Sequence, residues 1–429
     1  MKSNFLKKTI SMSLAVVMCS GIICSTGFFT KAAELENDDD IVAVELENDD
    51  DIVTDELEND DDDIVTDELE NDDDDIVAVE LENDDDDIVA AESAEVQGNL
   101  TSRASKTFVL KGITYRVIDD TSVEVAKVKR PIIAIPENGS LSIPATVSYH
   151  KKSYKVTSIG DFAFAYRNRL QKITLPNTVT TIGRGAFKKC LHLQEINLPD
   201  SLTSIGSEAF YWCYALHEIN IPNSVTTIGK KAFYTCTKLK KVKLPDSLTS
   251  IDSYTFYKCW RLNEIIIPNS VTTIGESAFQ NCNTLRKVKL SDSLTFIDYS
   301  AFDSCKHLQE ITIPDSVTAI RRAAFQNCTR LKKVKLPDSL TSIDSYTFYK
   351  CSSLKEINFP NSLNAIGELS FAYSDLCSVY IPNSITFIGT KAFFGTDLRY
   401  FVAPKRFEAD ISNRCILGNC NHVQVEYYD

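Results

Sequence analysis

Hydrophobic positions between about Pro144 and Pro404 recur every 23 residues. Each unit carries a phenylalanine, most carry a leucine six residues later, and most end at a proline. A fixed period of this length predicts a solenoid, because a single unit can bury its apolar face only against its neighbours. The phenylalanines that mark the turns are Phe164, Phe187, Phe210, Phe233, Phe256, Phe279, Phe302, Phe325, Phe348, Phe371 and Phe393. The pattern therefore predicts a β-rich solenoid of about eleven 23-residue turns.

One unit, residues 222–244, shows which element each stretch should form. Leu239, Val242 and Leu244 have strand spacing, and Pro245 ends the run. Residues 225–228 form a second short β segment, followed by a glycine that suits a tight corner. The stretch from Ala232 to Cys236 has the spacing of one helical turn. Stacked units should therefore build parallel strand ladders joined by short helical turns.

The N-terminal residues have the pattern of a secretory signal peptide. Lys2, Lys7 and Lys8 precede an apolar stretch over residues 10–29, and small residues allow cleavage after Ala32 or Ala33. An uncleaved membrane anchor is the alternative interpretation. We expect residues 1–33 to be removed, leaving an exported chain with no membrane span.

Residues 34–91 are five copies of a short acidic unit, ELENDDD or ELENDDDD followed by IV and two further residues. Of the 60 Asp and Glu residues, 32 lie between Glu34 and Glu95, where no Lys or Arg occurs. So few apolar groups cannot offset the entropy of ordering the backbone, so we expect residues 34–97 to be a disordered acidic arm. A solvating spacer is the simplest role, and diffuse binding of divalent cations is an alternative. The chain after the arm is basic, although the formal net charge is −15.

The repeat can be written P-x-S-[VL]-T-x-I-G-x-x-A-F-x-x-C-x-x-L-x-x-[IV]-x-[LI], and this pattern resembles the BspA-type leucine-rich repeat. The resemblance covers residues 144–404 and implies a leucine-rich-repeat stack. Residues 108–117 resemble the β-hairpin lead-in of such proteins, which implies a small N-terminal β cap over residues 98–143. Residues 405–429 remain as a C-terminal cap.

The resemblance also implies a secreted or cell-surface, adhesin-like protein. We expect a monomer that presents an extended repeat surface to an extracellular host or cell-surface protein or glycan. One alternative is an autoinhibited binder of polyanions whose acidic arm occupies its own basic face. The other is a passive surface-coat protein without a specific ligand.

Charged residues surround the central Ile or Val of each predicted strand. The preceding position alternates in sign, as in Glu218, Lys241 and Glu264, which predicts an ion-pair ladder between turns. On every second strand, the residues that flank this alternating position are Lys or Arg, so basic stripes form. Such stripes favour an anionic partner, although a solvated face is the alternative. Nucleic acid is not expected, because no aromatic residues interleave with the basic ones. The candidate binding residues are Lys240, Lys241, Lys243, Arg286, Lys287, Lys289, Lys332, Lys333 and Lys335.

Aromatic residues form a second candidate surface. Tyr211, Tyr234 and Tyr257 directly follow the core phenylalanine in three consecutive turns, and Trp212 and Trp260 lie close by. Because phenylalanine fills the inward position, these rings should lie partly exposed along one edge. Such an edge suits contacts with a glycan or a protein. Packing against neighbouring turns is the alternative.

Eight cysteines form one column, each three residues after a core phenylalanine: Cys190, Cys213, Cys236, Cys259, Cys282, Cys305, Cys328 and Cys351. A small buried hydrophobic residue repeated by duplication explains this column better than a disulfide ladder, because parallel Cβ vectors suit disulfides poorly. Cys415 and Cys420 lie beyond the repeats and are candidates for a disulfide. No metal site, cofactor or catalytic constellation is predicted, since the five histidines are scattered. We therefore do not expect an enzyme.

Overall fold

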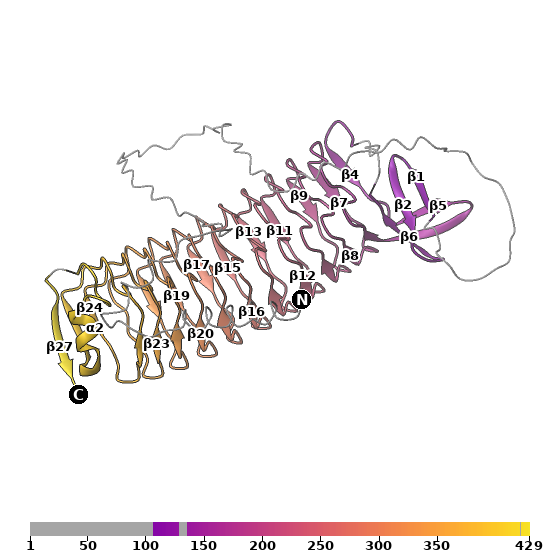
Figure 1. Ribbon diagram of the computed structural model, residues 1–429. Helices are drawn as coiled ribbons and strands as arrows, with labels where there is room; N and C mark the ends of the chain where they lie inside the picture. The colour runs from indigo at the N-terminus through magenta and orange to yellow at the C-terminus, as the bar shows by residue number, and fades with distance from the viewer. Residues whose placement is uncertain (1–105, 128–134, 421) are drawn as a thin grey trace, which may run out of the picture. The chain divides into compact units, whose positions relative to one another are not determined.

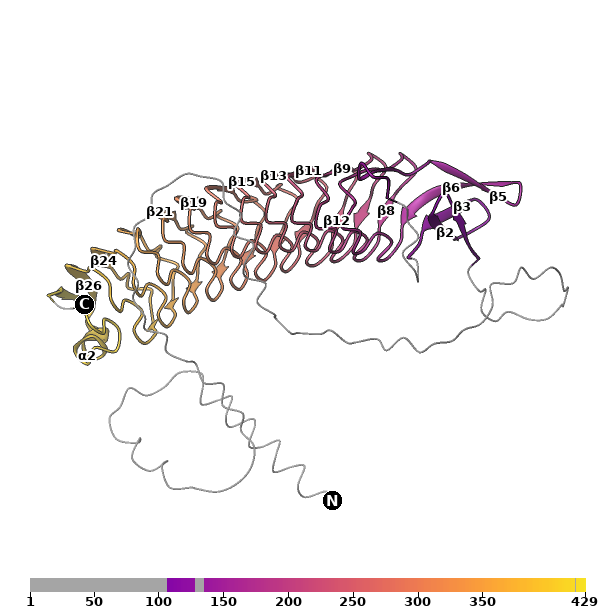
Figure 2. The same cartoon turned by 90° about the horizontal axis from the view of Figure 1, so that it is seen from above.

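A computed structural model describes residues 106–127, 135–420 and 422–429. The predicted signal peptide (1–33) and acidic arm (34–97) lie outside the described residues. The described part is built of short strands stacked turn upon turn, with little helix (Figures 1 and 2). This confirms the predicted leucine-rich-repeat solenoid, with about 12 turns.

The N-terminal strands form a small sheet that leads into the stack. Strands β1 (Thr107–Leu110) and β2 (Ile113–Val117) form an antiparallel hairpin, and β3 (Ser122–Val125) pairs antiparallel with β2. Strand β5 (Thr146–Tyr149) forms a second hairpin with β6 (Lys152–Ile159), and β6 pairs in parallel with β3. Because β6 also pairs in parallel with the first repeat strand, the hairpins continue directly into the solenoid.

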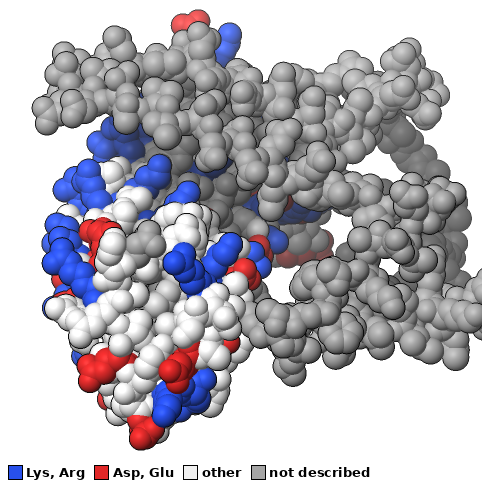
Figure 3. Space-filling model, turned by 60° about the vertical axis from the view of Figure 1, so that its left-hand side comes forward, with Lys and Arg blue, Asp and Glu red and all other residues white. Residues whose placement is uncertain are grey.

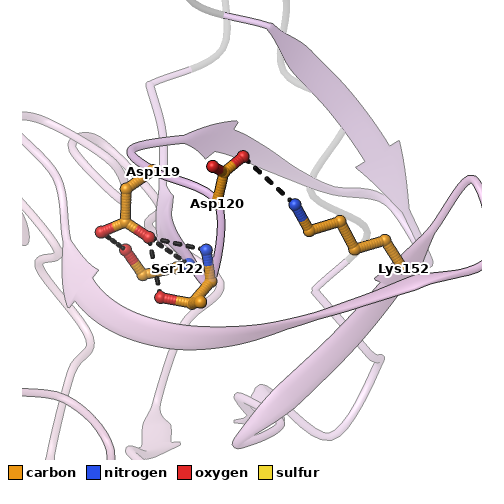
Figure 4. Close-up of polar contacts among 5 residues, drawn as sticks. Asp119, Asp120, Ser122 and Lys152 are labelled. Atoms are coloured by element: carbon orange, nitrogen blue, oxygen red, sulfur yellow. Dashed lines mark hydrogen bonds and ion pairs between the residues drawn. The ribbon is translucent and has the colours of Figure 1, made fainter.

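Asp119 holds the turn between β2 and β3 (Figure 4). Its Oδ1 accepts hydrogen bonds from the backbone N–H groups of Thr121 (2.7 Å) and Ser122 (2.8 Å), and Oδ2 accepts one from the Ser122 hydroxyl (2.6 Å). Its neighbour Asp120 forms an ion pair with Lys152 at 3.2 Å. These bonds favour the ionised carboxylate and lower the pKa of Asp119 to about 2.

One ladder of the solenoid consists of two-residue parallel strands that align one buried isoleucine per turn. Its hydrogen-bonded register joins, for example, Ile251 to Ile274 and Ile274 to Ile297. After β6, its strands are β8 (Thr181–Ile182), β10 (Ser204–Ile205), β12 (Thr227–Ile228), β14 (Ser250–Ile251), β16 (Thr273–Ile274), β18 (Phe296–Ile297), β20 (Ala319–Ile320), β22 (Ser342–Ile343), β23 (Ala365–Ile366) and β25 (Phe387–Ile388).

The second ladder consists of three-residue strands, and from residue 172 to residue 335 their central residue points inward and their outer two residues are exposed. We call the outward side of β7 to β21 in this ladder the strand face. The ladder contains β4 (Ser140–Ser142), β7 (Lys172–Thr174), β9 (Glu195–Asn197), β11 (Glu218–Asn220), β13 (Lys241–Lys243), β15 (Glu264–Ile266), β17 (Lys287–Lys289), β19 (Glu310–Thr312), β21 (Lys333–Lys335) and β24 (Ser378–Tyr380). This alternation of exposed and inward residues is typical of a strand that faces solvent on one side only.

The stretch predicted as a helical turn is instead a pair of tight turns. Cys236 N–H bonds to the Phe233 carbonyl at 3.2 Å, as one helical turn would allow. However, Lys231 and Thr235 have positive φ values of 59° and 57°, which end any helix there. The same two positions are left-handed in turn after turn, so the described repeats contain tight turns where we expected single helical turns.

The core is a stack of phenylalanine rings. Successive rings from Phe164 to Phe393 lie 5.2–5.5 Å apart between centroids, with interplanar angles of 1–17°. Each of these rings is fully buried. The cysteine column lies beside the stack, also fully buried. Each of its thiols donates to the backbone carbonyl of the phenylalanine 26 residues earlier, at 3.0–3.3 Å.

The C-terminal residues add one more turn to the second ladder. Strand β26 (Tyr400–Pro404) is followed by η1 (Lys405–Phe407) and α2 (Glu408–Ser412), and β27 (Gln424–Tyr428) returns to pair in parallel with β26. Cys420 Sγ lies 3.0 Å from the Phe393 carbonyl, so its thiol repeats the contact made by the cysteine column. The disulfide between Cys415 and Cys420 stays a prediction.

Candidate functional site

The nine basic residues singled out from the sequence all lie exposed on the strand face or at its edge. Six are the outer residues of β13, β17 and β21, on either side of the inward valines Val242, Val288 and Val334. The other three, Lys240, Arg286 and Lys332, directly precede these strands. The structure therefore brings all nine to one side of the stack, as three rows two turns apart. Lys and Arg side chains gather along one edge of the surface in Figure 3.

The predicted alternation of charge is present in the strand register. Glu218 pairs with Lys241, Glu264 with Lys287 and Glu310 with Lys333 as backbone neighbours in parallel strands. The predicted ion-pair ladder does not form along this column. Among the described residues of the column, only Lys172 and Glu195 form an ion pair, at 2.7 Å. None of the nine basic residues forms an ion pair with a described carboxylate. Within the described residues, no ion pair neutralises their charges.

The strand face carries open hollows beside and between the basic rows. A hollow of 710 Å³ lies over β9, β11 and β13 and is lined by residues of both signs, among them Glu195, Glu218, Lys241 and Lys243. A second hollow of 460 Å³ is lined by Lys289, Lys333 and Lys335 together with Glu310 and Asp292. These are open surface depressions, which suit an extended ligand better than an enclosed small molecule.

A third hollow, of 500 Å³, lies at the edge of the strand face. Lys240, Lys241 and Arg261 line it with Asn263, Glu264 and Thr284. Arg261 was not among the predicted binding residues, because it lies outside the strand positions that carried the charge pattern. Its position two residues after Cys259 brings it to the same edge as Lys240.

Ile266 was also missed by the sequence analysis. It is the last residue of β15, between Lys243 of β13 and Lys289 of β17, and it is 65% exposed. The third strand position holds asparagine, lysine or threonine in the neighbouring turns, so an isoleucine there looked like an ordinary member of the hydrophobic pattern. Its exposure places one apolar side chain in the middle of the basic rows.

The predicted aromatic edge is a stack of rings. Tyr211 and Tyr234 lie 4.7 Å apart, and Tyr234 and Tyr257 lie 4.6 Å apart, in each case nearly parallel. Ring faces that cover one another are not open to a sugar or an aromatic partner. Trp260 differs, since it is 46% exposed and has no ring contact among the described residues. The stack therefore presents ring edges, and Trp260 is the more open of the predicted aromatic residues.

Basic side chains lie against this stack. Lys188 Nζ lies 4.8 Å from the Tyr211 centroid, and Lys189 Nζ lies 4.4 Å from that of Trp212. Lys188 and Arg184 also pair with Glu208, at 2.7 and 3.1 Å. Burial raises the pKa of the Glu208 carboxyl, but these cations outweigh it, so the net pKa is lowered. Burial, reinforced by the charge of Glu208, raises the pKa of Tyr211 to about 12.

The described residues contain no group of three His, Cys, Asp or Glu side chains positioned to hold a metal ion. Within the same residues, no helix has the length and apolar character required to cross a membrane. The features that distinguish the surface are therefore the basic rows, the hollows between them and the aromatic stack.

Solved structures of bacterial leucine-rich repeat proteins resemble this fold. A leucine-rich repeat protein from Bacteroides ovatus is 28% identical, with a TM-score of 0.51, over 75% of this chain and 100% of that one. The pneumococcal vaccine antigen PcpA is 19% identical, with a TM-score of 0.51, over 76% of this chain and 89% of that one. A leucine-rich cell surface protein from Faecalibacterium prausnitzii is 25% identical, with a TM-score of 0.43, over 77% and 96%. No curated protein matches the chain.

The family model of the BspA type leucine rich repeat region, which contains six copies of the repeat, matches residues 157–286, 203–330 and 295–422. These matches overlap and together span most of the solenoid, including the basic rows and the aromatic stack. This solenoid typically serves as a scaffold for binding. The chain belongs to the BspA-type leucine-rich repeat family.

Proposed function

We propose that this protein is a secreted or cell-surface binding protein that presents its strand face to an extracellular protein or glycan, in the manner of an adhesin. The export part of the proposal is supported by the signal-peptide pattern of residues 1–33, which lies outside the described residues. The binding part is supported by the family, whose repeats build an extended surface in place of an enclosed pocket.

One observation carries the proposal: nine exposed cations stand on a rigid strand face, and none of them has a carboxylate partner among the described residues. Neighbouring glutamates are in register but do not form ion pairs with them. An excess of cations on one surface concentrates negative partners by long-range attraction. The hollows give such a partner more contact area than a flat surface would.

The test is a binding array of extracellular matrix proteins and cell-surface glycans, probed with the full chain at two salt concentrations. Replacing Ile266 by Asp should weaken binding at the strand face, because it puts a carboxylate between two lysine rows. The same change at Phe387, an exposed ladder residue of β25, is the control. Saturable binding that falls only in the first variant supports the proposal. Absence of binding across the whole array would favour a passive surface-coat protein.

A further inference from the structure

The outward residues of the strand face form three columns with different charge patterns. The central column alternates in sign, from Lys241 through Glu264, Lys287 and Glu310 to Lys333. The column on one side runs Lys243, Ile266, Lys289, Thr312, Lys335, and the column on the other runs Lys240, Asn263, Arg286, Gln309, Lys332. The two outer columns therefore carry a cation in every second turn and an uncharged residue between, with no carboxylate.

We propose that the strand face binds a linear anionic polysaccharide, whose sulfate or carboxylate groups meet the cations of an outer column while the chain runs across the strands. This inference rests on the proposed function and names the class of partner. The column of Lys243, Lys289 and Lys335 is the main track, and the parallel column of Lys240, Arg286 and Lys332 is the second.

The spacing of the cations matches a polymer charged at alternate units. Hydrogen-bonded strands such as β15 and β17 lie about 4.8 Å apart, so at a similar step per turn the cations in alternate turns are roughly 10 Å apart and three of them span roughly 20 Å. The core rings confirm the regularity of this step, since their centroids advance by 5.2–5.5 Å per turn. A polysaccharide of alternating charged and neutral sugars offers one anionic group per disaccharide, a length of the same order. Each anionic group can thus face one cation.

The residues between the cations suit neutral sugar units. Asn263 and Gln309 carry amides and Thr312 a hydroxyl, all exposed, and these groups both donate and accept hydrogen bonds as sugar hydroxyls do. Ile266, between Lys243 and Lys289, offers an exposed apolar surface to the C–H side of a sugar ring. The hollow lined by Lys240, Lys241 and Arg261 gives room for a bulky sulfate at the edge of the second track.

Other partners fit these columns less well. Duplex DNA carries one negative charge per about 1.7 Å of axis, far denser than one cation in roughly 10 Å, and it would cover Glu264 and Glu310. A second copy of the strand face would bring nine cations against nine, with too few glutamates to neutralise them. Among partners outside this chain, a folded acidic protein is the remaining alternative, and the experiment separates it from a glycan.

The experiment measures binding of the full chain to hyaluronan, which carries one carboxylate per disaccharide, to carboxyl-reduced hyaluronan and to an acidic matrix-protein panel at two salt concentrations. The first variant is Lys243→Gln with Lys289→Gln and Lys335→Gln. The matched control removes three charges away from the strand face: Lys230→Gln, Arg322→Gln and Lys350→Gln, all exposed. None of the six residues forms an ion pair among the described residues, but the three control residues lie over the rings of Tyr254, Tyr346 and Tyr349. Thermal unfolding therefore checks that both variants keep the fold.

Wild type should bind hyaluronan saturably and prefer it to the carboxyl-reduced form. The strand-face variant should lose about 10-fold or more in affinity and have a shallower salt dependence, while the control changes about 2-fold or less. Glu264→Gln with Glu310→Gln should strengthen binding. Equal losses in both triple variants would mean that net charge alone acts, and would overturn the inference. Binding to acidic proteins but not to hyaluronan would overturn it and leave the proposed function standing. Absence of binding to every probe would count against both this inference and the proposed function.

Discussion

Gln280 Nε2 donates a hydrogen bond of 2.8 Å to Asp303 Oδ2, across adjacent turns and in the column where tyrosines stack earlier in the chain. Ser304 Oγ donates to Oδ1 at 2.9 Å. Asp303 is only 6% exposed, and burial raises the pKa of its carboxyl despite these hydrogen bonds. A polar network therefore replaces the aromatic stack at this point of the solenoid.

Asp303→Asn should change how stability depends on pH. Because the pKa is higher in the folded state than in the unfolded state, the stabilisation from the protonated form is fully present below the ordinary Asp value. This stabilisation is lost as the pH rises through the higher pKa that Asp303 has in the folded state. The Asn variant cannot ionise and should lose this dependence, so its stability relative to wild type should rise with pH in that window. Urea unfolding at a series of pH values measures it, and parallel curves for the two proteins would contradict the assignment.

Asp119 should show the opposite sign. Its pKa is lowered to about 2 by bonds to Ser122 and Thr121, so its stabilisation of the β2–β3 turn is present above the ordinary Asp value. It is lost as pH falls from near 3.8 toward 2. Asp119→Ala should speed amide hydrogen exchange at Ser122 at neutral pH and remove this acid transition. Asp120→Ala, beside it, removes only an exposed ion pair and should leave the Ser122 amide protected.

The thiols of the cysteine column should resist modification in the folded protein. Burial raises their pKa values, and only the thiolate reacts readily. Under a neutral alkylating reagent, Cys282 and its column partners should stay unmodified until denaturant is added. Cys377 and Cys420, which are half-buried, should react first if reduced. Mass spectrometry of the native and unfolded protein gives the pattern, and rapid labelling of Cys282 would show that the column opens.

Phe279→Ala should destabilise the solenoid by about 3–5 kcal/mol, because it empties a fully buried place in the ring stack. Phe387→Ala removes the same side chain from an exposed site, 51% accessible, and should cost much less. Urea unfolding of both variants compares the two sites. A similar loss of stability in the two variants would mean that the ring stack does not dominate the core. Since turns contact only neighbours, the Phe279 change should also increase exchange in the adjacent turns before distant ones.

The inward columns were predictable from the sequence, because a residue that is buried in every turn must recur at the period of the turn. Phe233 and Cys236 illustrate this, since their spacing and neighbours fixed their inward position. The turn geometry around them was not predictable in the same way. The spacing of Phe233 and Cys236 fits a helical turn equally well, and the left-handed positions are occupied by ordinary residues such as Lys231 and Thr235.

The candidate site was likewise predictable from the sequence only in part. The exposed lysines of β13 and β17 followed from strand alternation, which is a local property. Whether Glu264 and Lys287 close an ion pair depends on side-chain conformations that the sequence pattern does not encode. The exposure of Ile266 and the approach of Arg261 to Lys240 depend on how successive turns are placed, so only the structure shows them.

The tyrosine stack should stabilise the fold more than it binds a ligand. Tyr234 is half-buried between Tyr211 and Tyr257, and burial first, then these two neighbours, raises its pKa. Tyr234→Ala should therefore lower stability by about 1–3 kcal/mol, since it removes two ring contacts and some buried area. Tyr234→Phe keeps the stack and should be nearly neutral.

Binding distinguishes this role from direct recognition. Neither Tyr234 variant should change hyaluronan affinity by more than about 2-fold, which is below 0.5 kcal/mol. Trp260→Ala serves as the comparison, because that ring is open to solvent and does not belong to the stack. Unfolding curves and binding isotherms on the same samples separate the two effects. A large loss of affinity in Tyr234→Phe, with stability unchanged, would show that the tyrosine hydroxyls contact the ligand and that the aromatic edge belongs to the binding surface.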